Sequence, residues 1–175
     1  MSKFTDKASN IKMVALDVDG VLTDGGIIYD NDGIESKRFS VRDGLGIRLL
    51  LDSGIKVGLI TARKSAIVEK RAKELSLSFV HQGIKKKWPC LLAELEKEQI
   101  TSAQCAFMGD DLLDLPILTK VGLAAAPDDA AHEVLEQVHW VADKAGGQGA
   151  VRDLAEMILK SQGKWSDIVS GLVAK

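Results

Sequence analysis

Short apolar runs alternate with amphipathic stretches along nearly the whole chain, and this alternation restricts the possible folds more than any other feature. Apolar runs of this length are typical of strands buried on both faces, and the amphipathic stretches between them are typical of crossover helices. We therefore expect an α/β fold, a doubly wound, Rossmann-like parallel sheet flanked by helices. Strands are predicted at 13–16, 57–60, 79–81, 105–108, 123–125 and 140–141, and helices near 45–52, 66–75, 88–97, 115–120, 130–138 and 151–162.

The segment after the first strand departs from this alternation. Two β-leaning runs, at 26–29 and 34–39, flank Asp30-Asn31-Asp32-Gly33, which is a strong turn signal. This pattern predicts a β-hairpin over about 26–39 that projects near the carboxyl end of the sheet. The remaining spacings leave no room for a cap domain, so we expect residues 1–175 to form a single domain with an open site.

The tail, about 163–175, carries an apolar stripe. Its members recur at helical spacing: Trp165, Ile168, Val169, Leu172 and Val173. Such a stripe must dock either on its own domain or on a neighbouring chain, and periodicity does not choose between them.

The composition excludes several classes of protein. The formal net charge is −2, whereas a general nucleic-acid binder is normally strongly basic. No apolar stretch approaches the ~20 residues that span a bilayer, and the polar segment 1–10 lacks the apolar centre of a secretory signal. Cys90 and Cys105 have no metal-binding spacing, so we expect reduced thiols in a cytoplasmic protein. We also expect that it binds no nucleic acid and does not insert into a membrane.

Carboxylates follow two of the predicted strands. Asp17 and Asp19 come after the first, and Asp110, Asp111 and Asp114 come after the fourth. The carboxyl ends of parallel strands meet at one edge of the sheet, where ligands bind. Carboxylates held this close repel one another and require a cation. Oxygen ligands select a hard ion such as Mg²⁺, and the lack of His or Cys in these loops argues against zinc.

The run from Asp17 to Thr23, Asp-Val-Asp-Gly-Val-Leu-Thr, is the most specific motif in the chain. Asp17 is placed to attack phosphorus and form an aspartyl-phosphate. Asp19 can protonate the leaving oxygen and later take a proton from water. The alternative is a calcium loop or a surface Asp-Gly turn, but a calcium hand needs flanking helices and the flanks here are strands.

Two further residues complete a phosphoryl-transfer site. Thr61 ends the second strand just before a helix, where a hydroxyl and helix-start amides suit phosphate, although simple N-capping is the alternative. Lys87 opens the helix after the third strand and can balance the charge of the nucleophile, although a solvated lysine within Lys85–Lys87 is equally plain. Asp110 is the natural metal ligand, and Asp114 would orient Lys87 or a water.

Four segments in this order resemble the haloacid dehalogenase superfamily of phosphotransferases: Asp17 to Thr23, Thr61, Lys87, and Gly109 to Asp114. The resemblance implies that Asp17, Asp110 and the backbone carbonyl of Asp19 bind Mg²⁺. It also implies that Asp111 and Asp114 support these ligands without binding the ion.

Longer runs closely resemble one family within it, the 3-deoxy-D-manno-octulosonate 8-phosphate (KDO 8-phosphate) phosphatases. The runs are Leu16 to Gly25, Val41 to Gly44 with Gly46 to Arg48, Gln82-Gly83 with Lys87, and Gly146 to Arg152. This resemblance implies a phosphatase that releases a free sugar acid for lipopolysaccharide synthesis, and a homotetramer whose hairpins associate centrally and whose tails reach a neighbour's site. The implied substrate contacts are Asp19, Ser40, Val41, Arg42, Asp43, Gly44, Arg48, Arg63, Arg71 and Lys87. One departure, Ala62 where a Gly often precedes the Arg, leaves the assignment standing.

Physical reasoning supports part of this assignment. Arg71 lies on an otherwise apolar helical face, which suits a carboxylate at an interface, although a snorkelling surface Arg is the alternative. Arg48 has a routine helical partner in Asp52. The glycine run before Val151, Gly146-Gly147-Gln148-Gly149, is weak evidence for a binding site on its own, and a turn into a helix is its default interpretation.

Two other functions compete with this one. A receiver-type phosphoswitch shares the fold, Mg²⁺ and a phosphoaspartate, but accepts phosphate on a later strand, which here ends in Thr61. The second is a phosphatase of a related nine-carbon sugar-acid phosphate, because the shape of the pocket, which the sequence does not give, decides between such substrates. A scaffold that has lost its activity belongs with this second alternative.

Overall fold

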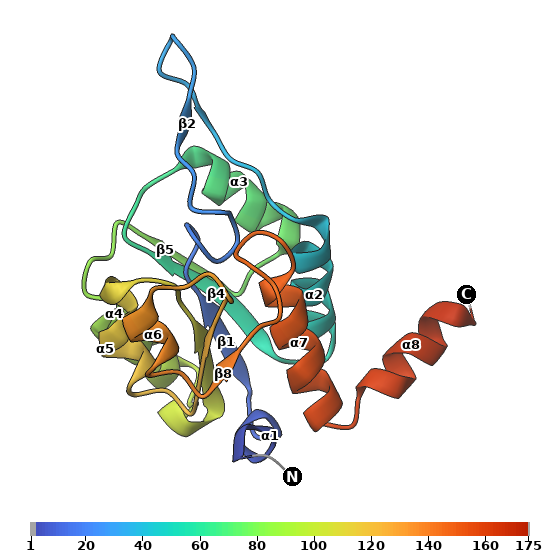
Figure 1. Ribbon diagram of the computed structural model, residues 1–175. Helices are drawn as coiled ribbons and strands as arrows, with labels where there is room; N and C mark the ends of the chain where they lie inside the picture. The colour runs from blue at the N-terminus through green and yellow to red at the C-terminus, as the bar shows by residue number, and fades with distance from the viewer. Residues whose placement is uncertain (1–2, 175) are drawn as a thin grey trace.

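A computed structural model describes residues 3–174 of the chain, so positions 1, 2 and 175 of the expected domain lie outside the described residues. The chain folds into a six-stranded sheet with helices on both faces and a separate two-stranded hairpin (Figure 1). This confirms the predicted fold class. The elements are α1 (Lys3–Ala8), β1 (Met13–Leu16), β2 (Ile28–Tyr29), β3 (Glu35–Ser36), α2 (Val41–Asp52), β4 (Lys56–Thr61), α3 (Ala66–Leu75), β5 (Phe79–Gln82), α4 (Lys87–Lys97), β6 (Cys105–Met108), α5 (Leu115–Leu118), β7 (Leu123–Ala126), α6 (His132–Leu135), β8 (Trp140–Val141), α7 (Ala150–Ser161) and α8 (Trp165–Val173). Two short 3₁₀ turns, Ser102–Gln104 and Leu112–Asp114, precede β6 and α5.

All six strands of the sheet run parallel in the order β5-β4-β1-β6-β7-β8. The chain fills one side of β1 first and then crosses to the other side, so the order reverses between β1 and β6. A parallel sheet opens a crevice at such a switch point, at the carboxyl ends of the two strands. The loops that begin at Asp17 and Gly109 lie there.

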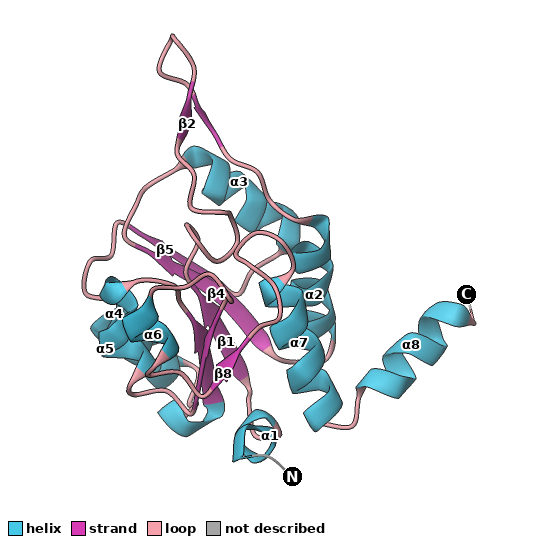
Figure 2. Ribbon diagram, in the orientation of Figure 1, coloured by secondary structure: helices cyan, strands magenta, loops and turns pink. Residues whose placement is uncertain are grey.

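The helices form two layers, as Figure 2 shows. The helices α1, α2, α3 and α7 pack on one face of the sheet, and α4, α5 and α6 pack on the other. Every residue of β1, β6 and β7 is buried, which explains why these strands are continuous apolar runs in the sequence.

The hairpin projects from the body of the molecule beyond the carboxyl end of the sheet (Figure 1). Its paired part, β2 with β3, is shorter than the predicted arms because only Ile28–Tyr29 and Glu35–Ser36 pair. Four large apolar side chains on it are more than half exposed: Ile27, Ile28, Tyr29 and Ile34.

Helix boundaries differ from the predicted ones where a cap or a turn intervenes. The helix α2 begins at Val41, four residues earlier than expected, because the Ser40 hydroxyl accepts the amide hydrogens of Arg42 and Asp43. The helices α5 and α6 are shorter than predicted, and the short helix α1 was not predicted at all. Within residues 3–174, no helix has both the length and the apolar character needed to cross a bilayer.

The tail forms the helix α8, as its apolar spacing predicts. Trp165 and Ile168 pack against the core that α7 covers, whereas Val169, Leu172 and Val173 are 41%, 58% and 83% exposed. Figure 1 shows α8 leading away from the body. The stripe therefore docks on its own chain at its start and leaves its end uncovered in one copy of the chain.

Candidate active site

A polar cavity of about 200 Å³ opens at the carboxyl ends of β1, β4 and β6. All of the predicted catalytic and metal-binding residues line it: Asp17, Asp19, Thr61, Lys87 and Asp110. The other lining residues are Ala62, Arg63, Asp111, Leu113 and Asp114. Four segments that are distant in sequence, the loops after β1, β4 and β6 and the start of α4, thus meet at this edge of the sheet.

Lys87 lies at the start of α4 and is 3% exposed. Its Nζ is 2.8 Å from Asp17 Oδ2 and donates a hydrogen bond of 2.6 Å to Asp114 Oδ1. Burial would lower the pKa of Lys87, but the charges of Asp17 and Asp114 raise it above its ordinary value. Lys87 is therefore a fixed positive charge beside the predicted nucleophile, and the solvated-lysine alternative does not describe it.

Asp114 is fully buried and holds the site together. Its Oδ2 accepts the amide hydrogens of Asp110 at 3.0 Å and Asp111 at 3.5 Å, while its other oxygen binds Lys87. Asp111 lines the cavity and caps the turn at Leu112–Asp114. Each carboxylate thus fixes a neighbour's backbone or charge.

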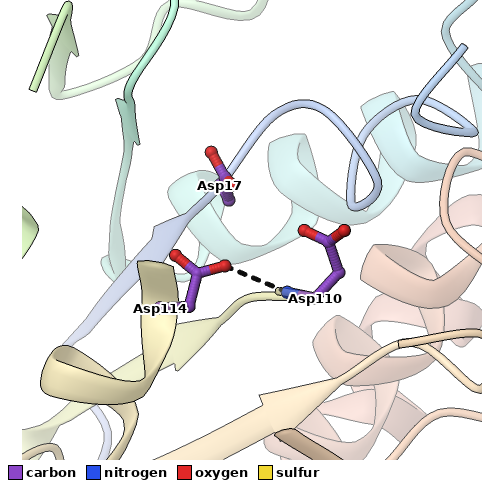
Figure 3. A group of neighbouring side chains, drawn as sticks. All are labelled: Asp17, Asp110 and Asp114. Atoms are coloured by element: carbon purple, nitrogen blue, oxygen red, sulfur yellow. Dashed lines mark hydrogen bonds between the residues drawn. The ribbon is translucent and has the colours of Figure 1, made fainter. Parts of the chain in front are cut away.

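Asp17, Asp110 and Asp114 lie close together, as Figure 3 shows, and each offers an oxygen within 4.8 Å of the others. Burial raises the pKa of Asp17 to about 6, with Lys87 opposing this and Asp114 adding to it. Burial, with the charges of Asp17 and Asp114, raises the pKa of Asp110 to about 7. Among the described residues, the buried Oδ1 atoms of Asp17 and Asp110 have no hydrogen-bond partner. Unsatisfied carboxylate oxygens in this arrangement fit a hard cation such as Mg²⁺.

Two glycines allow the loops to approach this closely. A Cβ atom at Gly20 would overlap the carboxylate of Asp110, and one at Gly109 would overlap the carboxylate of Asp114. Gly20 also has a φ of +86°, which other residues rarely adopt. The glycine of the Asp-x-Asp-Gly motif is therefore needed for contact between the two loops, and the glycine of the Gly-Asp-Asp motif lets Asp114 fold back onto its own loop.

Thr61 ends β4 at the mouth of the cavity and is 3% exposed. Its Oγ1 accepts the amide hydrogen of Arg63 at 3.3 Å and does not cap α3, whose N-cap is Ser65. The hydroxyl therefore orders the loop that follows β4 and faces the same space as Asp17.

The predicted proton donor, Asp19, faces the root of the hairpin. Its Oδ1 forms an ion pair with Lys37 just after β3, and its Oδ2 lies 3.7 Å from Arg63 Nε. Arg63 also binds the hydroxyl of Tyr29 and the carboxylate of Glu35. Sequence analysis did not identify Lys37, Glu35 or Tyr29. Alternation in the hairpin places Glu35 and Lys37 on one face, but only the folded loop brings that face to Asp19.

The other predicted substrate contacts lie outside this cavity. Asp43 is 1% exposed and accepts the amide hydrogens of Gly149 and Arg152, so it joins α2 to the start of α7. Arg42 lines two other cavities, both beside Gly147–Gly149. Ser40 caps α2, and Val41 is 81% exposed.

The two other predicted substrate contacts, Arg48 and Arg71, also lie outside the cavity, and each has partners near α3. Arg48 pairs with Asp52 and donates a hydrogen bond to the carbonyl of Leu75. Arg71 pairs with Glu74, lies over the ring of Phe39, and its guanidinium occupies the space that a Cβ at Gly44 would need. One copy of the chain therefore brings together the catalytic residues and Arg63, but not Ser40–Gly44, Arg48 and Arg71.

Several known proteins resemble this chain. Residues 73–153 match the model of the haloacid dehalogenase-like hydrolase family. The 3-deoxy-D-manno-octulosonate 8-phosphate phosphatase KdsC of Escherichia coli K12 is 45% identical over 158 residues, which are 90% of this chain and 84% of KdsC.

Two solved structures are also similar. The Moraxella catarrhalis 3-deoxy-D-manno-octulosonate 8-phosphate phosphatase, in complex with magnesium ion, phosphate ion and KDO, superposes with a TM-score of 0.96 at 40% identity, over 98% of this chain and 99% of that one. The cobalt-bound phosphatase of Haemophilus influenzae has a TM-score of 0.88 at 41% identity, over 91% of this chain and 94% of that one.

Proposed function

The chain belongs to the 3-deoxy-D-manno-octulosonate 8-phosphate phosphatases, a family of haloacid dehalogenase-like hydrolases, and we propose that it hydrolyses this ester to the free sugar acid and phosphate. It is a phosphoric monoester hydrolase. The observation that carries the proposal is the buried contact of Lys87 with Asp17 beside the carboxylates of Asp110 and Asp114. The released sugar acid would then enter lipopolysaccharide precursor synthesis.

The reaction has two steps at Asp17. A carboxylate oxygen of Asp17 bonds to phosphorus while the bond from phosphorus to the sugar oxygen breaks, and Asp19 gives that oxygen a proton. Water then attacks the phosphorus of the aspartyl-phosphate, the bond from phosphorus to the Asp17 oxygen breaks, and phosphate is released. Asp19, which lost its proton in the first step, takes the proton from the water. Lys87 balances the negative charge near Asp17, and the Thr61 hydroxyl with the amides after β4 supports the phosphoryl oxygens.

Mg²⁺ is the cofactor, and Asp17, Asp110 and the backbone carbonyl of Asp19 would hold it. When bound, it supplies positive charge that stabilises the phosphoryl oxygens. Asp114 remains bound to Lys87 and to the amides of the Asp110 loop, so its role is support. Asp111 has the same supporting role at the rim of the cavity.

Arg63 lines the cavity and would contact the substrate together with Lys87 and Asp19. The accessible distant contacts, Ser40–Arg42, Arg48 and Arg71, would serve a neighbouring subunit's cavity in a homo-oligomer, which we propose to be a tetramer. Asp43 and Gly44 are buried, so they would act by holding α2 against α7 and Arg71. The exposed apolar side chains of the hairpin support this assembly, because a monomer would leave them in water. Phosphoryl transfer needs an enclosed site, and the capless single domain that we propose would gain that enclosure from its neighbour.

Sedimentation of the full chain tests the assembly. We expect a species about four times the monomer mass, and replacing Ile28 and Ile34 by Glu should dissociate it. A monomer with full activity would contradict both the tetramer and the shared site.

A cytoplasmic location is also proposed, since Cys90 and Cys105 are both unpaired thiols.

A hydrolysis panel tests the substrate. Phosphate release is measured with Mg²⁺ on KDO 8-phosphate, on nine-carbon sugar-acid 9-phosphates and on simple sugar phosphates. We expect the highest kcat/KM with KDO 8-phosphate. A higher kcat/KM for a nine-carbon ester would make that ester the substrate in place of KDO 8-phosphate. A long-lived phosphoprotein without turnover would contradict the enzymatic function.

A further inference from the structure

Lys37 lies on the second arm of the hairpin, directly after β3, and its side chain is only 1% exposed. A lysine is rarely buried unless it is paired. Here the ammonium forms an ion pair with Asp19 and lies 3.5 Å from Glu35 Oε1. The neighbouring Arg38 is 70% exposed on the same arm, so the burial is particular to Lys37.

The contact reaches Asp19 from outside the cavity. Among the described residues that line the cavity, Asp19 and Arg63 are present and Lys37 is not. Asp19 is also outside the carboxylate cluster that fits a cation, because both of its oxygens face positive charges at the root of the hairpin. Lys37 can therefore influence the reaction only through its neighbours, directly through Asp19 and indirectly through Glu35, which binds Arg63.

The group around Lys37 is itself held in place. Glu35 accepts a hydrogen bond of 2.6 Å from the Ser65 hydroxyl and one of 3.2 Å from Arg63 Nη2. The two cations, Lys37 and Arg63, balance the two anions, Asp19 and Glu35. Only Lys37 is fully buried in this group, since the side chains of Asp19 and Glu35 are about one fifth exposed. Replacing Lys37 by an apolar residue would leave the charge of Asp19 less compensated and its carboxylate less well held.

We propose that Lys37 is a positioning residue that fixes the Asp19 carboxylate for proton transfer. The proposal rests on the proposed function, in which the proton of Asp19 goes to the sugar oxygen as its bond to phosphorus breaks. Proton transfer by a placed side chain contributes about 10²–10⁴-fold to the rate, and a misplacement of about 1 Å can cost on the order of 10²-fold. An ester whose leaving group departs without a proton needs no such placement in the first step, which is the step that kcat/KM reports.

The test compares two esters in the same variants, with saturating Mg²⁺. For the Lys37→Met variant, we expect kcat/KM for the sugar phosphate to fall on the order of 10- to 100-fold. We expect kcat/KM for p-nitrophenyl phosphate to fall less than about threefold, because its phenolate leaves without protonation. The Lys37→Arg variant keeps the charge and should recover most of the loss. The Arg38→Met variant removes an exposed charge from the same arm and should behave as wild type.

Parallel losses with both esters would show a merely structural role and overturn the proposal. Wild-type values in Lys37→Met, or no recovery in Lys37→Arg, would also overturn it. Thermal unfolding of each variant shows whether it is folded. If Lys37→Met does not fold, the same comparison of the two esters is made with Lys37→Arg. A wild-type enzyme that prefers another alkyl phosphate would refute the proposed substrate alone, and the same comparison with that ester would still measure the role of Lys37.

Discussion

Asp17 combines two properties that are rarely found in one side chain, since it contacts a buried lysine and yet keeps one oxygen without a partner among residues 3–174. An Asn at this position has nearly the same shape, but its neutral amide lacks the nucleophilic oxygen that forms the acyl phosphate. We expect the Asp17→Asn variant to lose turnover by at least about a thousandfold. Because burial raises the pKa of Asp17 to about 6, the ionised form is costly to bury, and a neutral amide should leave the fold intact.

Hydrolysis of KDO 8-phosphate and thermal unfolding check this prediction together. The matched control is Asp128→Asn, an exposed aspartate in the loop after β7. Turnover at the wild-type rate in the Asp17 variant would refute the nucleophile assignment.

Part of the site could be predicted residue by residue. Asp17 and Asp110 each follow a continuous apolar run, and parallel strands must bring the ends of such runs to one edge of the sheet. Lys37 could not be found in this way. Its partner, Asp19, lies 18 positions away, and the loop conformation that joins them depends on contacts that no periodicity encodes.

At the level of elements, the glycine run before α7 has a role that its sequence did not reveal. Gly147 donates its amide hydrogen to the carbonyl of Val21, and a Cβ at Gly146 would overlap the carbonyl of Gly20. The run therefore packs directly on the loop that carries Asp17 and Asp19. The sequence pattern predicted a turn into a helix, which is correct, but the partner of that turn is more than a hundred residues away.

Gly146→Ala tests this contact. Gly146 does not have a positive φ, so alanine can adopt its backbone conformation and the effect comes from the overlap alone. Because the Asp19 carbonyl is a proposed Mg²⁺ ligand, we expect the Mg²⁺ concentration for half-maximal activity to rise roughly tenfold. The Mg²⁺-induced rise in melting temperature should shift in parallel.

The control for this variant is Gly171→Ala in α8, where a Cβ would meet nothing within 4 Å. A Gly146 variant with the Mg²⁺ dependence of wild type would show that the run only connects β8 to α7.

The edge strand β8 has a pH-dependent anchor. His139 Nδ1 accepts the amide hydrogen of Ala124 at 2.9 Å, which requires that nitrogen to be unprotonated. Desolvation, with the charge of Lys7, lowers the pKa of His139 below its ordinary value. The folded-state pKa is thus below the unfolded one, so this stability is present above about pH 6.5 and is lost as the pH falls.

Replacing His139 by Gln should remove this dependence. Between pH 7.5 and 5, we expect the wild-type melting temperature to fall about 1–2 °C more than that of His139→Gln, a small effect because the ring is largely exposed. His132→Gln is the control, since His132 is 81% exposed and pairs with Glu136, four residues further along the chain. Identical pH profiles for wild type and His139→Gln would contradict the prediction.

In the whole molecule, α8 is a helix whose apolar side chains stay largely exposed in one copy of the chain. None of its residues is buried, and its last turn exposes Leu172 and Val173. The start of the helix is anchored differently, because the Trp165 ring lies about 5 Å from the charged ends of Arg152 and Lys160. This division supports a tail that is held at its start and engages a neighbour's cavity at its end.

Removal of the tail separates substrate binding from metal binding. We expect a chain that ends at Gly163 to have a KM for the sugar phosphate at least about tenfold higher, because burying one Leu side chain contributes about 1.5–3 kcal/mol. The Mg²⁺ dependence should not change, since Asp17, Asp19 and Asp110 lie elsewhere in the chain. A second chain that ends at Ile168 keeps the packed turn and should show the same loss if the exposed end makes the contact. An unchanged KM in both would show that the tail does not cover the site.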